Sequence, residues 1–251
     1  MRKFLSRFEI VNHLLSVIIL LPKYFQFFIE FFSFKKKSSN RFSVEVADLF
    51  PQLHDRTSDH GYDRHYIYHT AWAARILKKI KPKVHTDISS SLYFSAISSA
   101  WIKFKLYDFR PVDLRLDNLK SASADLTHLS FPSGSIASLS CMHTLEHIGL
   151  GRYGDPIDPD GDRHAMKELK RVLAKNGNLL IVVPVGKPKV MFNAHRIYSY
   201  LQVIENFRGL TLREFSLVPD EPNAHLIRNA SPSLVKKQAY ACGCFWFTKK
   251  R

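Results

Sequence analysis

Cysteine is scarce in this sequence. The 251 residues include only Cys141, Cys242 and Cys244, which are too few and too unevenly placed for a disulfide framework. This scarcity favours a reducing compartment and predicts a cytoplasmic protein. Cys242 and Cys244 are two residues apart on an expected strand and so share one face of it. We interpret them as core packing rather than as a metal or redox site.

The sequence also lacks an uncharged apolar run long enough to span a bilayer. The longest, Ile10 to Pro22, falls short of the ~20 residues that a spanning helix needs. Residues 4–34 are nevertheless apolar and rich in phenylalanine, and three lysines follow at 35–37. We expect Pro22 to break or kink a helix here. Residues 1–37 then form an interfacial anchor at the inner face of a membrane, or a helix pair packed on the domain or on a second subunit.

Acidic residues are outnumbered, with 22 Asp and Glu against 37 Lys and Arg, so the net charge is +15. Residues 1–41 contain eight basic and two acidic residues and carry +6 of it. No stripe of Lys and Arg interleaved with aromatic residues occurs within the expected domain. The charge therefore indicates an anionic membrane surface as partner rather than nucleic acid, with plain solubility as the alternative.

Internal repeats and long low-complexity tracts are absent, and the 45% hydrophobic content suits one sizeable core. Residues 38–65 are expected to be linker and irregular chain, and residues 66–251 one domain. Helices alternate with strands until the last two strands, which predicts an α/β domain with a mostly parallel sheet and an antiparallel ending. The expected strands are 83–88, 101–107, 123–126, 136–141, 178–184, 211–218 and 238–248, and the expected helices are 66–81, 89–96, 163–174 and 194–207.

The stretch 136–184 is the most informative part of the chain. A buried strand, 136–141, leads into an acidic loop at 142–162, an amphipathic helix at 163–174 and a second apolar strand at 178–184. Such a unit makes the two strands parallel neighbours. The loop then lies at their carboxyl edge, where open α/β sheets bind ligands.

From about Val84 to Phe247, the order of elements resembles the class I S-adenosylmethionine-dependent methyltransferases. Asp87 ends the first expected strand, Asp108 ends the second, and Asp125 lies in the third. The resemblance implies a Rossmann-like, seven-stranded sheet with an antiparallel last strand and S-adenosylmethionine as cofactor. It assigns the ribose hydroxyls to Asp108 and the adenine end to Asp125, and places the remaining cofactor contacts at Asp87, Ser89, Ser91 and Leu126.

More closely, the chain resembles a poorly characterised methyltransferase-like family of unknown function from nematodes and from bacteria, where it lies near surface-polysaccharide genes. The resemblance rests on the runs 65–69, 71–75, 141–162, 192–198 and 240–246. One departure from class I methyltransferases is clear. Where they have Gly-x-Gly-x-Gly, this chain has Ser89, Ser91 and Tyr93. Serines can cap the next helix, but Tyr93 puts a large side chain where the family has none.

Methyl transfer requires an acceptor held in line and the removal of its proton. His147 is our first candidate for the base and His143 the second, with Glu146 beside them, because histidine titrates near neutral pH. The alternative is that Glu146 and His147 only order the loop. His65, Tyr66 and His69 could close over the cofactor, although a packed aromatic helix explains them equally.

A hydroxyl-rich or anionic acceptor is expected at the same edge. Asp155, Asp158, Asp160 and Asp162 do not follow a calcium-loop pattern, and turn formation with capping by Asp162 explains them, so no metal is predicted. Asn193 has helix capping as its alternative role. The expected acceptor-binding residues are Arg152, Tyr153, Asp155, Asn193, His195 and Arg196.

The resemblance thus implies a methyltransferase-like enzyme acting on a glycan, or on another small acceptor. Transfer to a hydroxyl of a glycan or lipid-linked sugar is implied by the family context alone and by no residue of the chain. The alternatives are a scaffold protein of surface-glycan synthesis that has lost the cofactor, and an enzyme using another nucleotide-linked donor. The oligomeric state is left open.

Overall fold

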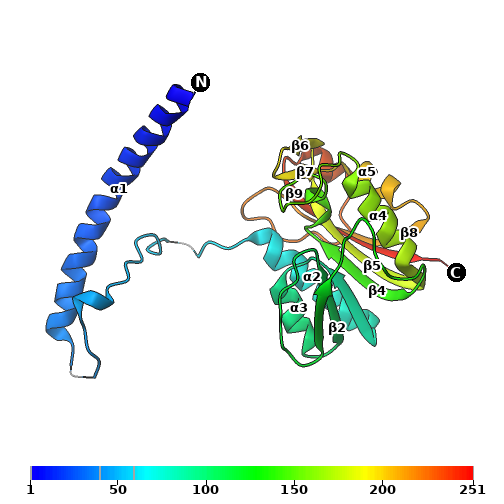
Figure 1. Ribbon diagram of the computed structural model, residues 1–251, viewed down its shortest axis with the longest axis horizontal. Coiled ribbons are helices and arrows are strands. Elements are labelled where there is room, and N and C mark those ends of the chain that lie inside the picture. The colour runs from blue at the N-terminus through cyan, green and yellow to red at the C-terminus, as the bar shows by residue number, and fades with distance from the viewer. Residues whose placement is uncertain (1, 40, 59, 251) are drawn as a thin grey trace. The chain divides into compact units, whose positions relative to one another are not determined.

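The computed structural model describes residues 2–39, 41–58 and 60–250, with side chains from Leu20 onward, and forms two compact units, 1–61 and 62–251 (Figure 1). The boundary falls just before the second helix, close to the position expected from the sequence.

The first unit is dominated by one helix, α1 (Arg2–Lys37), followed by a short 3-10 helix, Val46–Asp48. The expected break at Pro22 does not occur, because the helix continues through it. Ion pairs from Arg56 to Glu30 (2.9 Å) and from Lys35 to Glu45 (3.4 Å) hold the following segment against the helix. Among the described residues, no helix has the length and apolarity that crossing a membrane requires.

The second unit is built on a seven-stranded sheet in the order β3-β2-β1-β4-β5-β9-β8. Every pair from β3 to β5 is parallel, and β9 runs antiparallel to both β5 and β8. The expected α/β class and antiparallel ending are therefore confirmed. The strands are β1 (Val84–Ile88), β2 (Lys103–Asp108), β3 (Leu119–Ser123), β4 (Ile136–Met142), β5 (Leu173–Val185), β8 (Leu210–Val218) and β9 (Ala241–Lys249).

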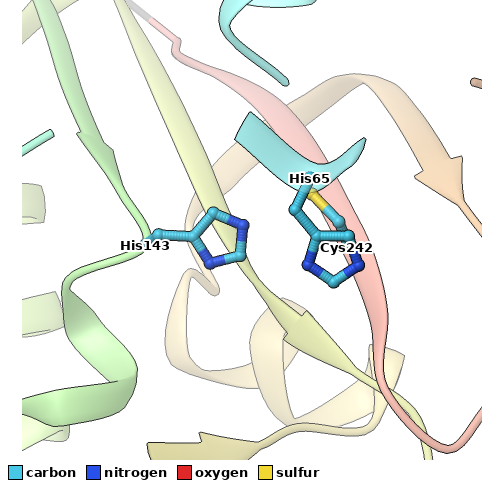
Figure 2. A group of neighbouring side chains, drawn as sticks. All are labelled: His65, His143 and Cys242. Atoms are coloured by element: carbon cyan, nitrogen blue, oxygen red, sulfur yellow. The ribbon is translucent and has the colours of Figure 1, made fainter. Parts of the chain in front are cut away.

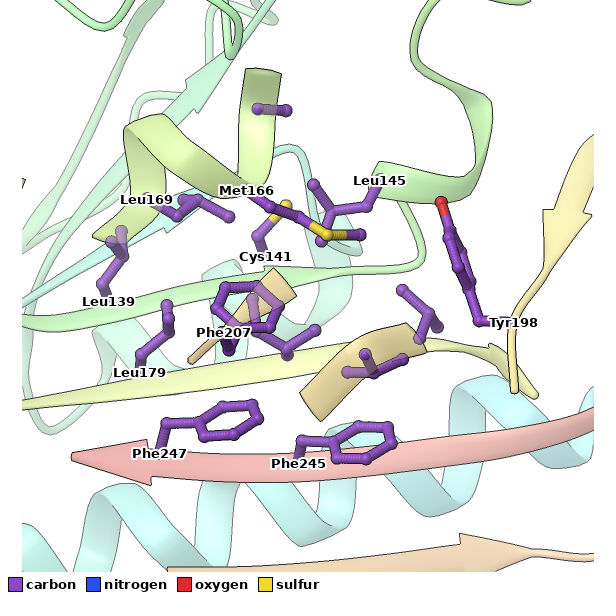
Figure 3. Close-up of a cluster of buried hydrophobic side chains, with 14 of the residues drawn as sticks. Leu139, Cys141, Leu145, Met166, Leu169, Leu179, Tyr198, Phe207, Phe245 and Phe247 are labelled. Atoms are coloured by element: carbon purple, nitrogen blue, oxygen red, sulfur yellow. The ribbon is translucent and has the colours of Figure 1, made fainter. Parts of the chain in front are cut away.

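Helices cover both faces of this sheet, which is why β5 reads as a nearly continuous apolar run. On one face, α4 (Gly161–Val172) and α5 (Tyr200–Asn206) pack over a core that includes Leu139, Met166 and Phe245 (Figure 3). On the other, α2 (Arg64–Ile80) and α3 (Leu92–Ser99) bury Trp72 and Phe104. The loops that follow β1, β2 and β4 lie together at the carboxyl edge of the sheet.

Several element boundaries differ from the expected ones for local reasons. The helix expected at 194–207 begins only at Tyr200, because Ser199 and Gln202 form a capping box there. The residues before it form β7 (His195–Ile197), which pairs with β6 (Lys189–Met191). At the other end of the domain, α2 begins at Arg64, capped by Asp63, whose carboxylate accepts from Tyr66 N at 3.1 Å.

Candidate functional site

Two neighbouring cavities open near the carboxyl edge of the sheet. The smaller one, called here the strand-edge cavity, has a volume of about 290 Å³ and lies among the loops that follow β1, β2, β3 and β4. Six of the residues expected at a site line it: Ser89, Asp125, Leu126, His147, Tyr153 and Asp155.

The turn after β1 reaches its shape without glycine. Ser89 adopts φ 57°, in the left-handed region where glycine is usual. Its N–H donates to Tyr107 O at 2.8 Å, and the Thr144 hydroxyl donates to Ser89 O at 2.8 Å. These two bonds hold a conformation that costs roughly 1–2 kcal/mol for a residue with a side chain.

Asp87 holds this turn through hydrogen bonds. It is completely buried and accepts hydrogen bonds from Ser90 N (3.0 Å) and from the Ser140 hydroxyl. Burial raises the pKa of Asp87 to about 6, against the lowering effect of these bonds. Asp87 is thus placed to position the turn, and it is not among the residues that line the strand-edge cavity.

Tyr93 leaves the strand-edge cavity open. Its side chain is 82% exposed on the first turn of α3, so the large residue in the glycine position points into solvent. Ser91 takes the N-cap position of α3 but makes no side-chain cap bond within the described residues. It lines a separate apolar groove with Tyr66 and Phe94.

The two acidic residues after β2 and β3 are held by turns. Asp108 accepts from Arg110 N at 2.8 Å, and the next residue, Phe109, lines the strand-edge cavity. Asp125 accepts from Thr127 N and Oγ1 at 2.8 and 2.7 Å. The side chain of Asp125 is 49% exposed at the cavity wall, which leaves it available to a ligand.

The larger cavity, called here the histidine cavity, has a volume of about 810 Å³. Its wall includes Asp63, Asp220 and Tyr240. Sequence reasoning did not assign these residues to the site because they come from the start of α2 and from the loop between β8 and β9. Asp220 accepts from Ala239 N and Tyr240 N, which fixes this wall. The expected residues that line it are His143, Glu146, His147, Arg152, Tyr153 and His195, together with His65 and Tyr66.

His147 is set up to accept a proton. Its Nδ1 lies 2.7 Å from Ala194 O, which can only accept, and 3.2 Å from Arg152 Nη1, which can only donate. The shorter contact favours the tautomer with the ring proton on Nδ1. Arg152 Nη1 donates to the same carbonyl at 3.0 Å. In the neutral ring, Nε2 therefore holds the free lone pair.

His143 and Glu146 form a buried pair. Nδ1 of His143 lies 2.8 Å from Glu146 Oε1, while His143 Nε2 and Glu146 Oε2 are buried without hydrogen-bond partners among the described residues. Burial disfavours the imidazolium, but contacts with Cys242 and Glu146 outweigh it and raise the pKa of His143 to about 10. This places His143 in an ionic pair rather than in a titrating base.

Arg196 and Asn193 lie outside both cavities. Arg196 is buried, donates to Ile148 O (2.6 Å) and Pro159 O (3.2 Å), and lies 3.6 Å from Asp162, so it fastens the loop after β4. Asn193 is exposed, beside β6 and β7 rather than at a helix cap.

The acidic series of this loop has structural partners. Asp160, not Asp162 as expected, takes the N-cap position of α4, and Asp162 accepts from the Tyr198 hydroxyl at 2.8 Å. Asp155 accepts from Gly149 N at 2.7 Å, and Asp158 lies 3.0 Å from His164 Nδ1. These bonds order the loop that walls the strand-edge cavity.

Comparison with known proteins finds one matching family model. Residues 126–225 match the model of a family described as Caenorhabditis protein of unknown function, DUF268. No curated protein matches the chain.

Solved structures match over most of the chain. The Burkholderia thailandensis 1,6-didemethyltoxoflavin-N1-methyltransferase, with bound S-adenosylhomocysteine, is 14% identical, with a TM-score of 0.53 over 72% of this chain and 78% of that one. The N-methyltransferase NodS from Bradyrhizobium japonicum, in complex with S-adenosylhomocysteine, is 13% identical, with a TM-score of 0.50 over 72% and 85%. The chain thus carries a segment that matches a family of unknown function, on a domain with the fold of class I methyltransferases.

Proposed function

We propose that the domain binds S-adenosylmethionine in the strand-edge cavity and transfers its methyl group to an acceptor in the histidine cavity. The observation that carries the proposal is that His147 and Tyr153 line both cavities. A donor and an acceptor bound on either side of these residues would meet between them. The two similar structures named above contain S-adenosylhomocysteine, which supports the choice of cofactor.

The residues of the strand-edge cavity suit a nucleoside. Asp125 presents a half-exposed carboxylate, Leu126 and Phe109 add apolar surface, and the Ser89 turn brings backbone close to the cavity. When bound, S-adenosylmethionine supplies a methyl group on a sulfonium sulfur. The chain itself needs to orient this group and to exclude water from it.

The histidine cavity suits a hydroxyl-bearing acceptor such as a sugar of a glycan or lipid-linked glycan. Carboxylates of Asp63 and Asp220 can accept from hydroxyls, and the rings of Tyr66 and Tyr240 offer flat apolar surface. His147 Nε2 would take the hydroxyl proton as the methyl group passes from the sulfonium sulfur to the acceptor oxygen, with neutral S-adenosylhomocysteine as the leaving group. Its Nδ1–H bond to Ala194 O fixes the ring in the tautomer that this step requires.

The proposal also places residues 1–37 at an anionic membrane surface on the cytoplasmic side. Leu21, Phe25, Phe28 and Phe32 form one exposed stripe of α1, and exposed lysines at 35–37 follow it. This arrangement would bring the domain to lipid-linked acceptors.

Calorimetric titration of the full chain with S-adenosylmethionine and S-adenosylhomocysteine tests the proposal. We expect saturable binding, and at least a tenfold loss of affinity in Asp125→Ala, because a charged hydrogen bond is worth about 1.5–3 kcal/mol. Asp113→Ala removes a solvent-exposed carboxylate paired with Arg115 and is the matched control. Absence of binding heat at millimolar ligand would instead support a cofactor-free scaffold protein.

A further inference from the structure

Three side chains that the proposed methyl transfer does not use meet beside the histidine cavity. A ring nitrogen of His65, a ring nitrogen of His143 and Sγ of Cys242 lie within 4.8 Å of one another. Figure 2 shows the His143 ring directed from the end of β4 toward the other two, which come from α2 and β9. We infer that these residues bind a divalent transition metal ion of the zinc class, as a two-histidine, one-cysteine site.

The backbone explains why these distant residues meet. His143 N donates to Val182 O on β5 at 2.8 Å, and Cys242 pairs with Pro184 on the same strand, so both are fixed against β5. The cap at Asp63 fixes the start of α2, which places His65 over them. All three positions thus rest on hydrogen-bonded backbone rather than on a free loop.

Two buried polar atoms at the cluster lack hydrogen-bond partners, and a bound cation would supply a partner. His143 is 8% exposed, yet its Nε2 has no hydrogen-bond partner among the described residues, and the same is true of Oε2 of Glu146, which is 1% exposed. A buried polar group without a partner costs about 1–3 kcal/mol. The ion-pair partners of Glu146 in the described part of the chain are His143 and His147. A metal ion bound at His143 Nε2 would replace the proton that this nitrogen carries in the ionic pair.

Glu146 matches the arrangement found behind metal-binding histidines. Such a histidine donates its other ring N–H to a carboxylate, which fixes the tautomer and increases ligand basicity. Here His143 Nδ1 lies 2.8 Å from Glu146 Oε1, which turns Nε2 toward the cluster. Glu146 is therefore a positioning residue for the metal ligand, a role different from the catalytic one expected from the sequence.

Ligand type and space agree with zinc. Imidazole and thiolate are ligands that zinc prefers, and tetrahedral zinc holds such atoms roughly 3.5 Å apart, as its bond lengths require. Here the ligand atoms lie within 4.8 Å of one another and the half-buried His65 ring stacks on His143 with centroids 5.6 Å apart, so metal binding requires the His65 ring to turn out of this stack. Three protein ligands leave a fourth position open. His65 and His143 line the histidine cavity, so, if the proposed function holds, the open position would take an acceptor oxygen there.

Metal binding by the full chain, freed of metal by a chelator and then titrated with ZnCl₂ or CoCl₂, tests the inference. We expect one bound equivalent and, with Co²⁺, the absorption band of a cobalt–thiolate bond. Cys242→Ala should abolish the band, and His65→Ala should weaken binding at least tenfold. Glu146→Gln should weaken it about 10- to 100-fold.

Cys141→Ala is the matched control, because Cys141 is equally buried but belongs to the core on the opposite face of the sheet. It should keep both the stoichiometry and the band. Failure of the parent chain to bind either ion, or binding that survives in both Cys242→Ala and His65→Ala, would overturn the inference. The metal-free chain is also titrated with S-adenosylhomocysteine. If it binds this ligand but no metal, the metal site is wrong and the proposed function stands; if it binds metal but not the ligand, the reverse holds.

Discussion

The rings of His147 and Tyr153 meet edge to face, with centroids 5.7 Å apart and planes at 85°, where the two cavities adjoin. Arg110 and Arg152 lie over the Tyr153 ring at 4.5 and 5.1 Å, which holds it in place. The contacts of Tyr153 thus hold the His147 ring in a position where it lines both cavities. This geometry makes it the residue on which the proposed chemistry depends.

Replacing His147 should therefore affect chemistry more than cofactor binding. In His147→Gln, we expect turnover to fall roughly a hundredfold to ten-thousandfold, because a positioned base contributes about that much. Formation of S-adenosylhomocysteine with a panel of sugar acceptors measures the rate, and calorimetry measures cofactor affinity. His225→Gln, an exposed histidine bonded to Tyr68, is the control. Unchanged turnover in His147→Gln would remove it as the base.

Asp87 should make stability depend on pH. Its folded pKa of about 6 lies above the ordinary value of 3.8, so the folded state binds more protons between these values. This carboxyl therefore costs stability as pH rises from about 4 to 6, on the order of 3 kcal/mol in total. Asp87→Asn should remove that loss and be relatively more stable at pH 7 than at pH 4.

Urea denaturation of both proteins across this range provides the measurement. His85, bonded to Ser138 and Ser140, also affects the pH dependence, because burial lowers its pKa from 6.5 to about 3. Its neutral ring stabilises the folded state above pH 6.5, and this stabilisation is lost progressively as pH falls below that value. His85 is present in both proteins but shares the Ser140 hydroxyl with Asp87, so the difference between them reports Asp87 together with its coupling to His85. A difference that does not vary with pH would contradict the assignment.

Gly149 should tolerate no side chain. It adopts φ +78°, and a Cβ there would lie 2.0 Å from Asp158 O, a backbone atom of the strand-edge cavity wall. We expect Gly149→Ala to cost more than about 3 kcal/mol, combining left-handed strain with this clash. Gly134→Ala is a matched control, since Gly134 has φ +70° but open space around it, and should cost about 1 kcal/mol. Equal losses in urea denaturation would show that the clash is relieved at no cost.

The exposed stripe of α1 should bind anionic vesicles. Changing Phe25, Phe28 and Phe32 to serine removes large exposed rings without touching the Glu30–Arg56 ion pair. We expect sedimentation with phosphatidylserine vesicles to fall sharply and to weaken with added salt in the parent chain. Phe50→Ser removes an equally exposed ring outside the helix and serves as control. If the triple variant sediments like the parent, the membrane contact lies elsewhere.

The fold could be predicted from the sequence because buried strands have local runs of apolar residues. The run 179–184 is apolar throughout and buried in β5, as strands covered on both faces of a parallel sheet require. β3 was misplaced because it is an edge strand in which only Leu119 is buried, so little periodicity marks it. Asp125, which was expected within that strand, lies in the loop after it.

The site was less predictable because its contacts are distant in the chain. His147 and Tyr153 were recognised because they share one loop after β4. The contact of Cys242 with His65 and His143, like the bond from Trp72 Nε1 to Glu214 Oε1 at 2.9 Å, depends on how α2 packs on β8 and β9. Such packing has no local signature. The turn at Ser89 was hidden for another reason, since hydrogen bonds there replace the usual glycine.

The most direct test of the central claim is a crystal structure of the full chain with S-adenosylhomocysteine. We predict that the adenosine occupies the strand-edge cavity beside Asp125 and Leu126, with its sulfur directed toward His147 and Tyr153. A nucleoside bound at any other place on the domain, or a strand-edge cavity filled by the chain's own residues at saturating ligand, would contradict the account.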